Sequence, residues 1–177
     1  MRIIAGWLGG RSFESPRGHR THPMSEKARG AIFNALGDIK GLSVLDAFAG
    51  SGALAFEAVS RGAASALAIE VDNTAQTIIK RNIETLGIGD RVKSIRANAS
   101  AWSNRHHDVT FDIVLCDPPY DDMQYKVIRK LANHLKSGGI FVISLPGAHE
   151  KLTLEGLEIV QTKDYGDAQL VFYRRIS

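Results

Sequence analysis

From residue 41 onward, short apolar runs of strand length alternate with amphipathic segments of helix length, and this alternation leaves the chain few possible folds. Parallel strands that helices cover on both faces carry nearly continuous apolar side chains, as these runs do. The pattern therefore predicts an α/β fold with a mostly parallel sheet. We expect strands at residues 43–46, 66–70, 91–96, 111–116 and 139–144, helices at 53–61, 73–86 and 123–136, and a final antiparallel hairpin formed by 157–163 and 168–175.

The first 40 residues follow a different pattern. Glycines and prolines interrupt residues 1–23, and the Gly9-Gly10 pair between two short apolar runs predicts a short β-hairpin. Ser25 is a typical N-cap residue, and apolar side chains recur at helical spacing after it. We therefore expect an N-terminal hairpin and helix extension at residues 1–40 and a main domain at residues 41–177.

The positive charge of the chain is concentrated in this extension. Residues 1–40 carry seven Lys or Arg and three Asp or Glu, a net charge of +4, whereas the rest of the chain carries fifteen and sixteen, a net charge of −1. A basic segment on a nearly neutral body suits a polyanion such as RNA, although an ordinary solvated segment is the alternative. The candidate RNA-binding residues are Arg11, Arg17, Arg20 and Lys27.

Length and composition exclude several classes of protein. A chain of 177 residues is the size of one domain with a small appendage. The single cysteine, Cys116, excludes an intrachain disulfide and a zinc site built from several cysteines. No apolar run approaches the length of a membrane-spanning helix. We therefore expect a cytoplasmic protein with no metal site and no membrane contact, and nothing in the sequence requires more than a monomer.

A glycine-rich loop follows the first predicted strand, where the sequence reads Asp46-Ala47-Phe48-Ala49-Gly50-Ser51-Gly52. Ligands of open parallel sheets bind beyond the carboxyl ends of the strands, and glycines there allow a tight turn and a close approach. Glu70 ends the next strand, where a carboxylate can accept hydrogen bonds from ribose hydroxyls. The loop therefore predicts a cofactor that contains a nucleoside.

Two observations favour S-adenosylmethionine over a dinucleotide. The carboxylate of Asp46 would repel a pyrophosphate but suits a cationic amine and sulfonium, and the chain is short for a dehydrogenase. Asn98, after the third strand, offers an amide to an adenine edge, although a turn asparagine is the alternative. The predicted cofactor site consists of Asp46, Phe48, Gly50, Ser51, Gly52, Glu70, Val71, Asn98 and Ala99.

The tetrad Asp117-Pro118-Pro119-Tyr120 follows the fourth strand and is the most specific motif in the chain. The two prolines hold the backbone extended and leave carbonyl groups free to accept hydrogen bonds. A carboxylate and a carbonyl can together accept both N–H groups of an exocyclic amine while an aromatic ring stacks on the base. These four residues are therefore the candidate catalytic residues, and the catalysis they suggest is orientation and electrostatics.

With these two motifs, four stretches of the sequence resemble the RsmD family of bacterial 16S ribosomal RNA (guanine-N2) methyltransferases: residues 1–6, 22–34, 44–54 and 57–63. The resemblance covers nearly the whole chain. It implies a Rossmann-like sheet of seven strands, of the class I S-adenosylmethionine-dependent methyltransferase type, that follows an N-terminal hairpin and helix. It also implies that Gly50, Gly52 and Glu70 bind cofactor, that the residues from Asp117 to Tyr120 hold the guanine amine, and that the partner is ribosomal RNA or the small ribosomal subunit.

Three positions depart from the usual pattern of that family. Met24, Gly30 and Asn98 stand where the family commonly has threonine, glutamate and aspartate. Other readings of the same motifs stay open, because the tetrad also suits an adenine N6, a cytosine N4 or a protein glutamine amine. A non-catalytic RNA-binding assembly factor with this fold is a further alternative, and a nicotinamide enzyme is the weakest one.

Overall fold

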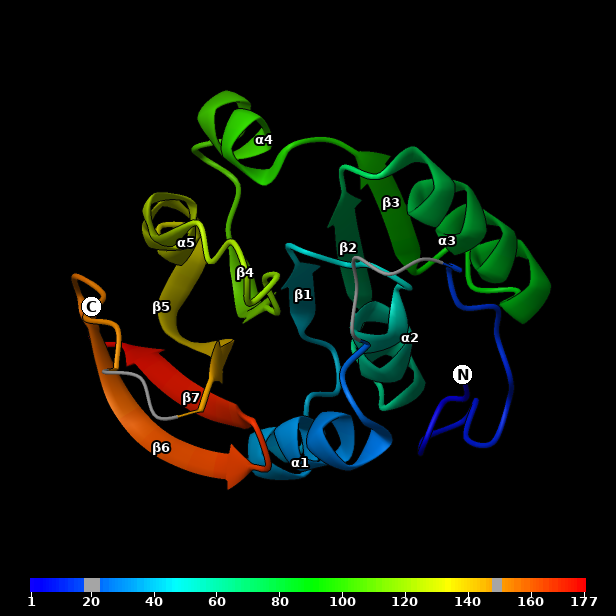
Figure 1. The fold of residues 1–177 in the computed structure, drawn as a ribbon, viewed down its shortest axis with the longest axis horizontal. Helices are drawn as coiled ribbons and strands as arrows, with labels where there is room; N and C mark the ends of the chain where they lie inside the picture. The colour runs from blue at the N-terminus through cyan, green and yellow to red at the C-terminus, as the bar shows by residue number, and fades with distance from the viewer. Residues whose placement is uncertain (18–22, 148–150) are drawn as a thin grey trace.

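A computed structural model gives the structure of residues 1–17, 23–147 and 151–177. In these ranges the chain forms five helices and seven strands (Figure 1). In chain order they are α1 (Glu26–Leu36), β1 (Ser43–Asp46), α2 (Ala53–Ser60), β2 (Ser65–Glu70), α3 (Asn73–Leu86), β3 (Val92–Arg96), α4 (Ala99–Arg105), β4 (Phe111–Cys116), α5 (Tyr125–Ala132), β5 (Leu135–Pro146), β6 (Leu157–Tyr165) and β7 (Ala168–Arg175).

All seven strands lie in one sheet, in the order β3-β2-β1-β4-β5-β7-β6. The pairs from β3 to β5 are parallel, and β7 is antiparallel to both β5 and β6. The predicted mostly parallel sheet with a final antiparallel hairpin is therefore confirmed. The strand order reverses at β1, which lies between β2 and β4, and such a switch point is where open α/β sheets bind ligands.

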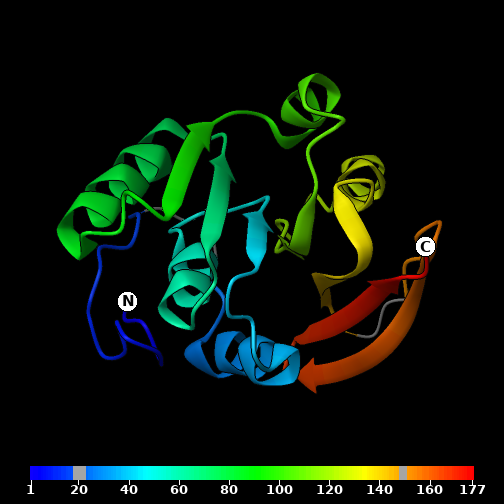
Figure 2. The ribbon, with the colours of Figure 1, turned by 180° about the vertical axis from the view of Figure 1, so that it is seen from behind.

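Helices cover both faces of the sheet. Figures 1 and 2 show α1, α2 and α3 on one side and α4 and α5 on the other. Two clusters of buried apolar side chains lie in these two layers. Consecutive residues of β1 belong to different clusters, because Val44 packs with the layer of α1, α2 and α3 and Leu45 packs with the layer of α4 and α5. This alternation is what a strand buried on both faces requires, so the apolar runs of the sequence are explained. None of the helices in the described ranges is long and apolar enough to cross a membrane.

Several element boundaries differ from the sequence prediction. The helix expected at 73–86 is α3, and its N-cap is Asp72, whose side chain accepts a hydrogen bond from the amide of Ala75 at 2.8 Å. The short helix α4 is missed, because seven residues rich in serine and asparagine give a weak helical pattern. The helix predicted at 123–136 is shorter as α5, since β5 begins at Leu135.

The predicted N-terminal hairpin is present in reduced form. It contains one antiparallel bridge, between Arg2 and Ser12, and its other contacts include hydrogen bonds from the amides of Ile3 to Arg11 (2.9 Å) and of Phe13 to Met1 (2.9 Å). The helix expected after Ser25 is confirmed as α1, and the Ser25 hydroxyl caps it by accepting from the amide of Ala28 at 3.1 Å.

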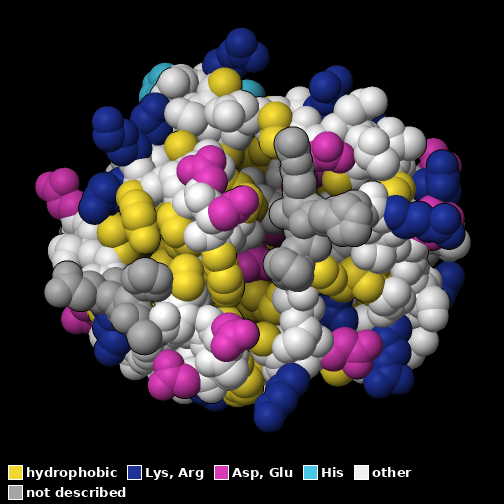
Figure 3. Space-filling model, in the orientation of Figure 1, with side chains coloured by type: hydrophobic (Ala, Val, Ile, Leu, Met, Phe, Trp, Pro, Cys, Tyr) yellow, Lys and Arg dark blue, Asp and Glu magenta, His cyan; other side chains and the backbone are white. Residues whose placement is uncertain are grey.

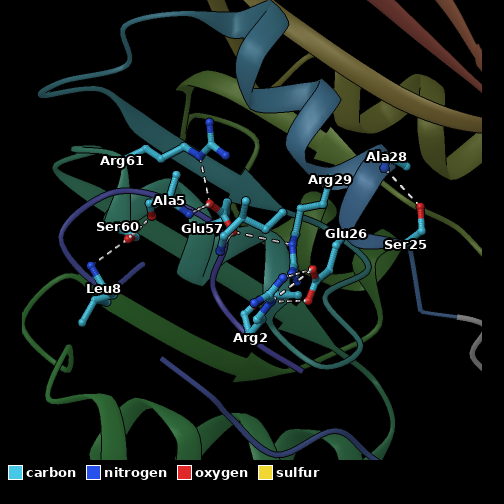
Figure 4. Close-up of polar contacts among 12 residues, drawn as sticks. Arg2, Ala5, Leu8, Ser25, Glu26, Ala28, Arg29, Glu57, Ser60 and Arg61 are labelled. Carbon is cyan, nitrogen blue, oxygen red and sulfur yellow. Dashed lines mark hydrogen bonds and ion pairs between the residues drawn. The ribbon is translucent and has the colours of Figure 1, made fainter. Parts of the chain in front are cut away.

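The buried carboxylate of Glu57 on α2 fixes this hairpin to α2 (Figure 4). One of its oxygens accepts from the amide of Ile4 at 2.9 Å, and the other accepts from the amide of Ala5 at 3.1 Å and from Nε of Arg61 at 2.8 Å. The guanidinium of Arg29, on α1, lies with its Nε 3.6 Å from the same carboxylate. A single carboxylate thus joins the hairpin, α1 and α2.

Candidate functional site

A cavity of about 760 Å³ opens at the carboxyl ends of the parallel strands, between the start of α1 and the turn that joins β6 to β7. Figure 3 shows this face hollowed near its centre, with acidic and hydrophobic side chains around the hollow and most Lys and Arg side chains towards the edge. Eleven of the thirteen residues predicted for cofactor binding and catalysis line the cavity: Phe48, Gly50, Ser51, Glu70, Val71, Asn98, Ala99, Asp117, Pro118, Pro119 and Tyr120.

The glycine-rich loop lines part of the cavity with backbone atoms. Gly50 and Gly52 have φ angles of 55° and 85°, values at which a side chain would be strained. A Cβ added at Gly50 would meet nothing within 4 Å, whereas one added at Gly52 would lie 2.6 Å from the ring of Phe56. Gly50 therefore presents backbone to the cavity, while Gly52 lies outside the cavity lining and lets the loop pack tightly on α2.

The carboxylate of Glu70 is held at the end of β2 by two backbone amides. One oxygen accepts from Gly50 at 2.7 Å, and the other accepts from Asp72 at 3.0 Å. Each carboxylate oxygen has a second lone pair, so both can still accept a hydrogen bond from a ligand hydroxyl. Val71 also lines the cavity and is 60% exposed, so an apolar side chain lies next to the carboxylate of Glu70.

Asn98 has a structural role that the sequence prediction gave as the alternative. It is the N-cap of α4, and its side-chain oxygen accepts from the amide of Ala101 at 3.1 Å. It also lines the cavity and is exposed, and the cap leaves the donors of its amide NH₂ group unused. The cap explains why an asparagine can stand at this position in place of an acidic residue, since both cap helices well.

Asp46 lies beneath the cavity, outside its lining. It is fully buried, and while Oδ2 accepts from the amide of Ala55 at 3.3 Å, Oδ1 has no hydrogen-bond partner in the described part of the chain. Burial, followed by the neighbouring charge of Asp117, raises the pKa of Asp46 to about 8. An unpartnered buried carboxyl is expensive to maintain, so it points to a role in function.

The tetrad after β4 joins the cavity to the end of β5. Burial raises the pKa of Asp117 to about 6, and a hydrogen bond from the hydroxyl of Ser144 lowers it in part. The hydroxyls of Tyr120 and Ser144 are 2.5 Å apart. Either hydroxyl of this pair can donate to the other. Ser144 thus connects the two functional side chains of the tetrad.

Sequence reasoning missed several residues of this site. Ser144 is buried at the end of β5, and Tyr165, Asp167 and Ala168 line the cavity from the β6–β7 turn. The carbonyl of Asp167 accepts from the amide of Gly147 at 2.6 Å, which fixes the turn against the end of β5. A sequence signal exists only for Ser144, because it is the last residue of the strand predicted at 139–144; the β6–β7 turn reaches the cavity only through the tertiary fold.

The candidate RNA-binding residues lie elsewhere. Arg11, Arg17 and Lys27 are exposed and outside the cavity lining, and Arg11 donates to the carbonyl of Thr85 at 3.2 Å. Arg20 lies outside the described residues. Across residues 1–17, 23–147 and 151–177, no cluster of three or more His, Cys, Asp or Glu could hold a metal ion.

Two of the positions that depart from the pattern of the RsmD family, Met24 and Gly30, lie in different places in the structure. Met24 lines the cavity beside Ser25, so an apolar thioether stands there in place of a hydroxyl. Gly30 lies on α1, where an added Cβ would meet the side chain of Ile4 at 3.7 Å, an ordinary contact distance. A larger side chain would therefore fit at this position, so the packing does not explain the glycine. Any contact that the usual glutamate makes is absent from this protein.

Comparison with known proteins identifies the family. The family model described as "Conserved hypothetical protein 95" matches residues 1–174. The ribosomal RNA small subunit methyltransferase D of Buchnera aphidicola is 34% identical over 136 residues, which cover 76% of this chain and 69% of the relative.

Solved structures share the fold. The yhhF protein of Escherichia coli has a TM-score of 0.88 and is 29% identical, and the match covers 99% of this chain and 98% of that one. The structure of SMU.776 complexed with SAH has a TM-score of 0.65 at 16% identity, over 84% of this chain and 48% of that one. The chain therefore belongs to the Conserved hypothetical protein 95 family, the RsmD family of methyltransferases.

Proposed function

We propose that this protein transfers a methyl group from S-adenosylmethionine to the exocyclic N2 amine of a guanine in 16S ribosomal RNA. The observation that carries the proposal is that Asp117-Pro118-Pro119-Tyr120 lines the same cavity as the glycine-rich loop and Glu70. One cavity thus holds groups suited to a nucleoside cofactor and groups suited to a planar amine. The name of the Buchnera relative supplies the substrate class, the RNA of the small ribosomal subunit.

The residues that line the cavity fit this cofactor. A volume of about 760 Å³ is in the range of cofactor pockets. Glu70 would accept from the ribose hydroxyls, Val71 would cover one face of the adenine, and the amide of Asn98 would meet its edge. The unpartnered buried carboxyl of Asp46 suits a nearby cation. When bound, the cofactor supplies an electrophilic methyl group on a sulfonium, and the related fold of SMU.776 was solved with SAH.

The tetrad would orient the amine. The carboxylate of Asp117 and the carbonyl of Pro118 accept its two N–H groups while the ring of Tyr120, 43% exposed, stacks on the base. This grip would hold the nitrogen lone pair towards the methyl carbon that S-adenosylmethionine would supply, with the S–C bond as the one that the new N–C bond would replace. The nitrogen loses one proton as it is methylated. With its pKa raised to about 6, Asp117 is mostly ionised at neutral pH and can accept that proton.

A second carboxylate favours guanine among the possible bases. The guanine N2 amine is flanked by an N–H donor (N1) on one side and a lone-pair acceptor (N3) on the other, whereas the ring nitrogen beside the amine of adenine (N1) or cytosine (N3) is an acceptor and neither has an N–H donor there. Asp167 lines the cavity near Tyr120. The pKa of Tyr120 is raised mainly by burial, and the charge of Asp167 adds a small increase. An acidic side chain at that end of the cavity would accept from the guanine N1–H and would repel the lone pair of the other two bases.

A methyl-transfer assay with three substrate classes tests the proposal. Labelled S-adenosylmethionine is incubated with small ribosomal subunits from cells that lack the enzyme, with free ribosomal RNA and with a protein extract. We expect label in the RNA of one or both ribosomal samples, loss of transfer in Asp117→Ala, and full transfer in Asp122→Ala, a change at an exposed aspartate outside the cavity lining. Transfer to protein alone would contradict the proposed substrate, and transfer that survives in Asp117→Ala would contradict the proposed role of the tetrad.

A further inference from the structure

Trp7, near the tip of the N-terminal hairpin, has an unusual environment for a tryptophan. It is 58% exposed, although tryptophan is the largest apolar side chain and is highly buried on average. The hairpin packs on the main domain through other residues, because Ile3, Leu8 and Phe13 are 0%, 1% and 7% exposed. The buried apolar contacts of the hairpin are therefore made by residues other than Trp7.

The exposed ring is nevertheless held in a fixed position. The backbone amide of Trp7 donates to the carbonyl of Ser60 at 3.0 Å, and the indole N–H donates to the carbonyl of Val59 at 3.1 Å. Leu8 donates to the hydroxyl of Ser60 at 3.0 Å (Figure 4). Gly6 packs so closely that an added Cβ would lie 1.9 Å from the carbonyl oxygen of Ser60. The ring is therefore pre-oriented, and ordering it on binding has little entropic cost.

The outer surface of Trp7 has only π character to offer. Indole has one hydrogen-bond donor and no acceptor, and the donor is already bonded to Val59. A partner that uses this surface must therefore stack on it or pack against it.

One cationic side chain lies over the ring, and a second belongs to the same hairpin. The guanidinium of Arg91 is over the Trp7 ring, 5.9 Å from its centroid. Arg11 follows Gly9-Gly10 in the hairpin, and its guanidinium donates to the carbonyl of Thr85 at 3.2 Å; Arg91 and Arg11 are both exposed. Aromatic rings beside arginines are the pattern that single-stranded nucleic acids use, with a base on the ring and phosphates on the cations. An apolar protein partner would instead need an apolar rim. The chemistry around Trp7 therefore matches an unpaired nucleotide.

We propose that Trp7 is a stacking platform for an unpaired base of the RNA substrate, with Arg91 and Arg11 at the flanking phosphates. The inference rests on the proposed function, since it takes the substrate to be RNA. Trp7, Arg91 and Arg11 are outside the lining of the catalytic cavity, so this is a second contact with the RNA. The platform docks the substrate and takes no part in methyl transfer, so its loss raises KM and leaves kcat unchanged.

Tryptophan fluorescence tests the platform directly. The chain has two tryptophans, and Trp102 is buried at 3% exposure, so acrylamide quenches mainly Trp7. Titration with a fragment of 16S ribosomal RNA is expected to quench Trp7 emission and to protect it from acrylamide. Because quenching depends on binding and not on methyl transfer, the platform is tested even if the proposed reaction is wrong.

Variants give the second readout. We expect Trp7→Ala to raise KM for the RNA roughly tenfold, with kcat and S-adenosylmethionine affinity unchanged, and Trp7→Phe to restore part of the loss. Ile176→Ala is the matched control, because Ile176 is a 64% exposed apolar residue outside the platform. If RNA is methylated but leaves Trp7 emission unchanged, and Trp7→Ala has the KM of Ile176→Ala, the platform is refuted and the proposed function stands.

Discussion

Replacing Asp46 with asparagine should stabilise the protein in the absence of cofactor. The carboxyl is fully buried, Oδ1 has no partner in the described ranges, and the pKa is raised to about 8 by burial and then by the charge of Asp117. Asparagine has nearly the same shape, can accept the hydrogen bond from Ala55 with its carbonyl, and never ionises. The substitution therefore removes the electrostatic cost of this carboxyl while it keeps the packing.

The size of the effect follows from proton linkage. In the unfolded chain the carboxyl titrates near 3.8, whereas in the folded chain it titrates at about 8. Between these values the folded state binds the extra proton, so the stability of the wild type falls as pH rises from about 4 to about 8. At 1.36 kcal/mol per pH unit, ionisation of Asp46 lowers the free energy of unfolding at pH 7 by about 4 kcal/mol. Asp46→Asn removes this loss, but an asparagine NH₂ group without a hydrogen-bond partner costs about 2 kcal/mol, so the net stabilisation is about 2 kcal/mol.

Denaturant unfolding of wild type and Asp46→Asn at pH 5 and pH 8 measures this effect. The stabilisation by asparagine should be larger at pH 8 than at pH 5 by about 4 kcal/mol, in order of magnitude. Asp122→Asn, at an exposed aspartate, controls for the loss of one charge. A stabilisation that is equal at the two pH values, or a destabilisation at pH 8, would refute the reasoning. We also expect Asp46→Asn to bind S-adenosylmethionine more weakly, measured by calorimetry.

Three further predictions concern other parts of the molecule. Ser144→Ala removes the hydroxyl that lowers the pKa of Asp117, so the acidic limb of the pH–rate profile should move to higher pH; an unmoved limb would contradict the connection. Glu57→Gln leaves the buried guanidinium of Arg29 without its counter-charge and should cost about 3–5 kcal/mol in denaturant unfolding, whereas a loss below about 1 kcal/mol would show that the carboxylate is not the anchor. The last change neutralises the four candidate RNA contacts, Arg11, Arg17, Arg20 and Lys27. It should weaken RNA binding and reduce the salt dependence of that binding, while cofactor affinity stays the same. An unchanged RNA affinity would show that these residues lie outside the RNA interface.

The parts of this molecule that could be predicted are those where local sequence and fold agree. The strands of the parallel sheet are nearly continuous apolar runs, and β1 shows why, since Val44 and Leu45 face different helical layers. The glycine-rich loop and the tetrad that starts at Asp117 were recognisable because each follows directly after such a strand. Residues at the ends of neighbouring parallel strands must meet at one edge of the sheet, so the cavity could be anticipated.

The remaining parts depend on tertiary structure. Asp46 is fully buried and lies outside the cavity lining, and no feature of the sequence shows this. Tyr165 and Asp167 reach the cavity because the β6–β7 hairpin curves over the end of β5, more than 20 residues away in sequence from Ser144. The helix α4 was missed because Asn98, which reads as a turn residue, caps a helix of low intrinsic propensity.

The identity of the methylated nucleoside decides whether this cavity methylates guanine N2. Ribosomal RNA of the small subunit, methylated by the purified protein with S-adenosylmethionine, is digested to nucleosides and separated by chromatography with mass detection. We expect N2-methylguanosine at one position of the RNA, and none in the reaction with Asp117→Ala. N6-methyladenosine or N4-methylcytidine in its place would contradict the assignment of guanine, and the absence of any methylated nucleoside from RNA that binds the protein would contradict the assignment of this cavity as an RNA-methylating site.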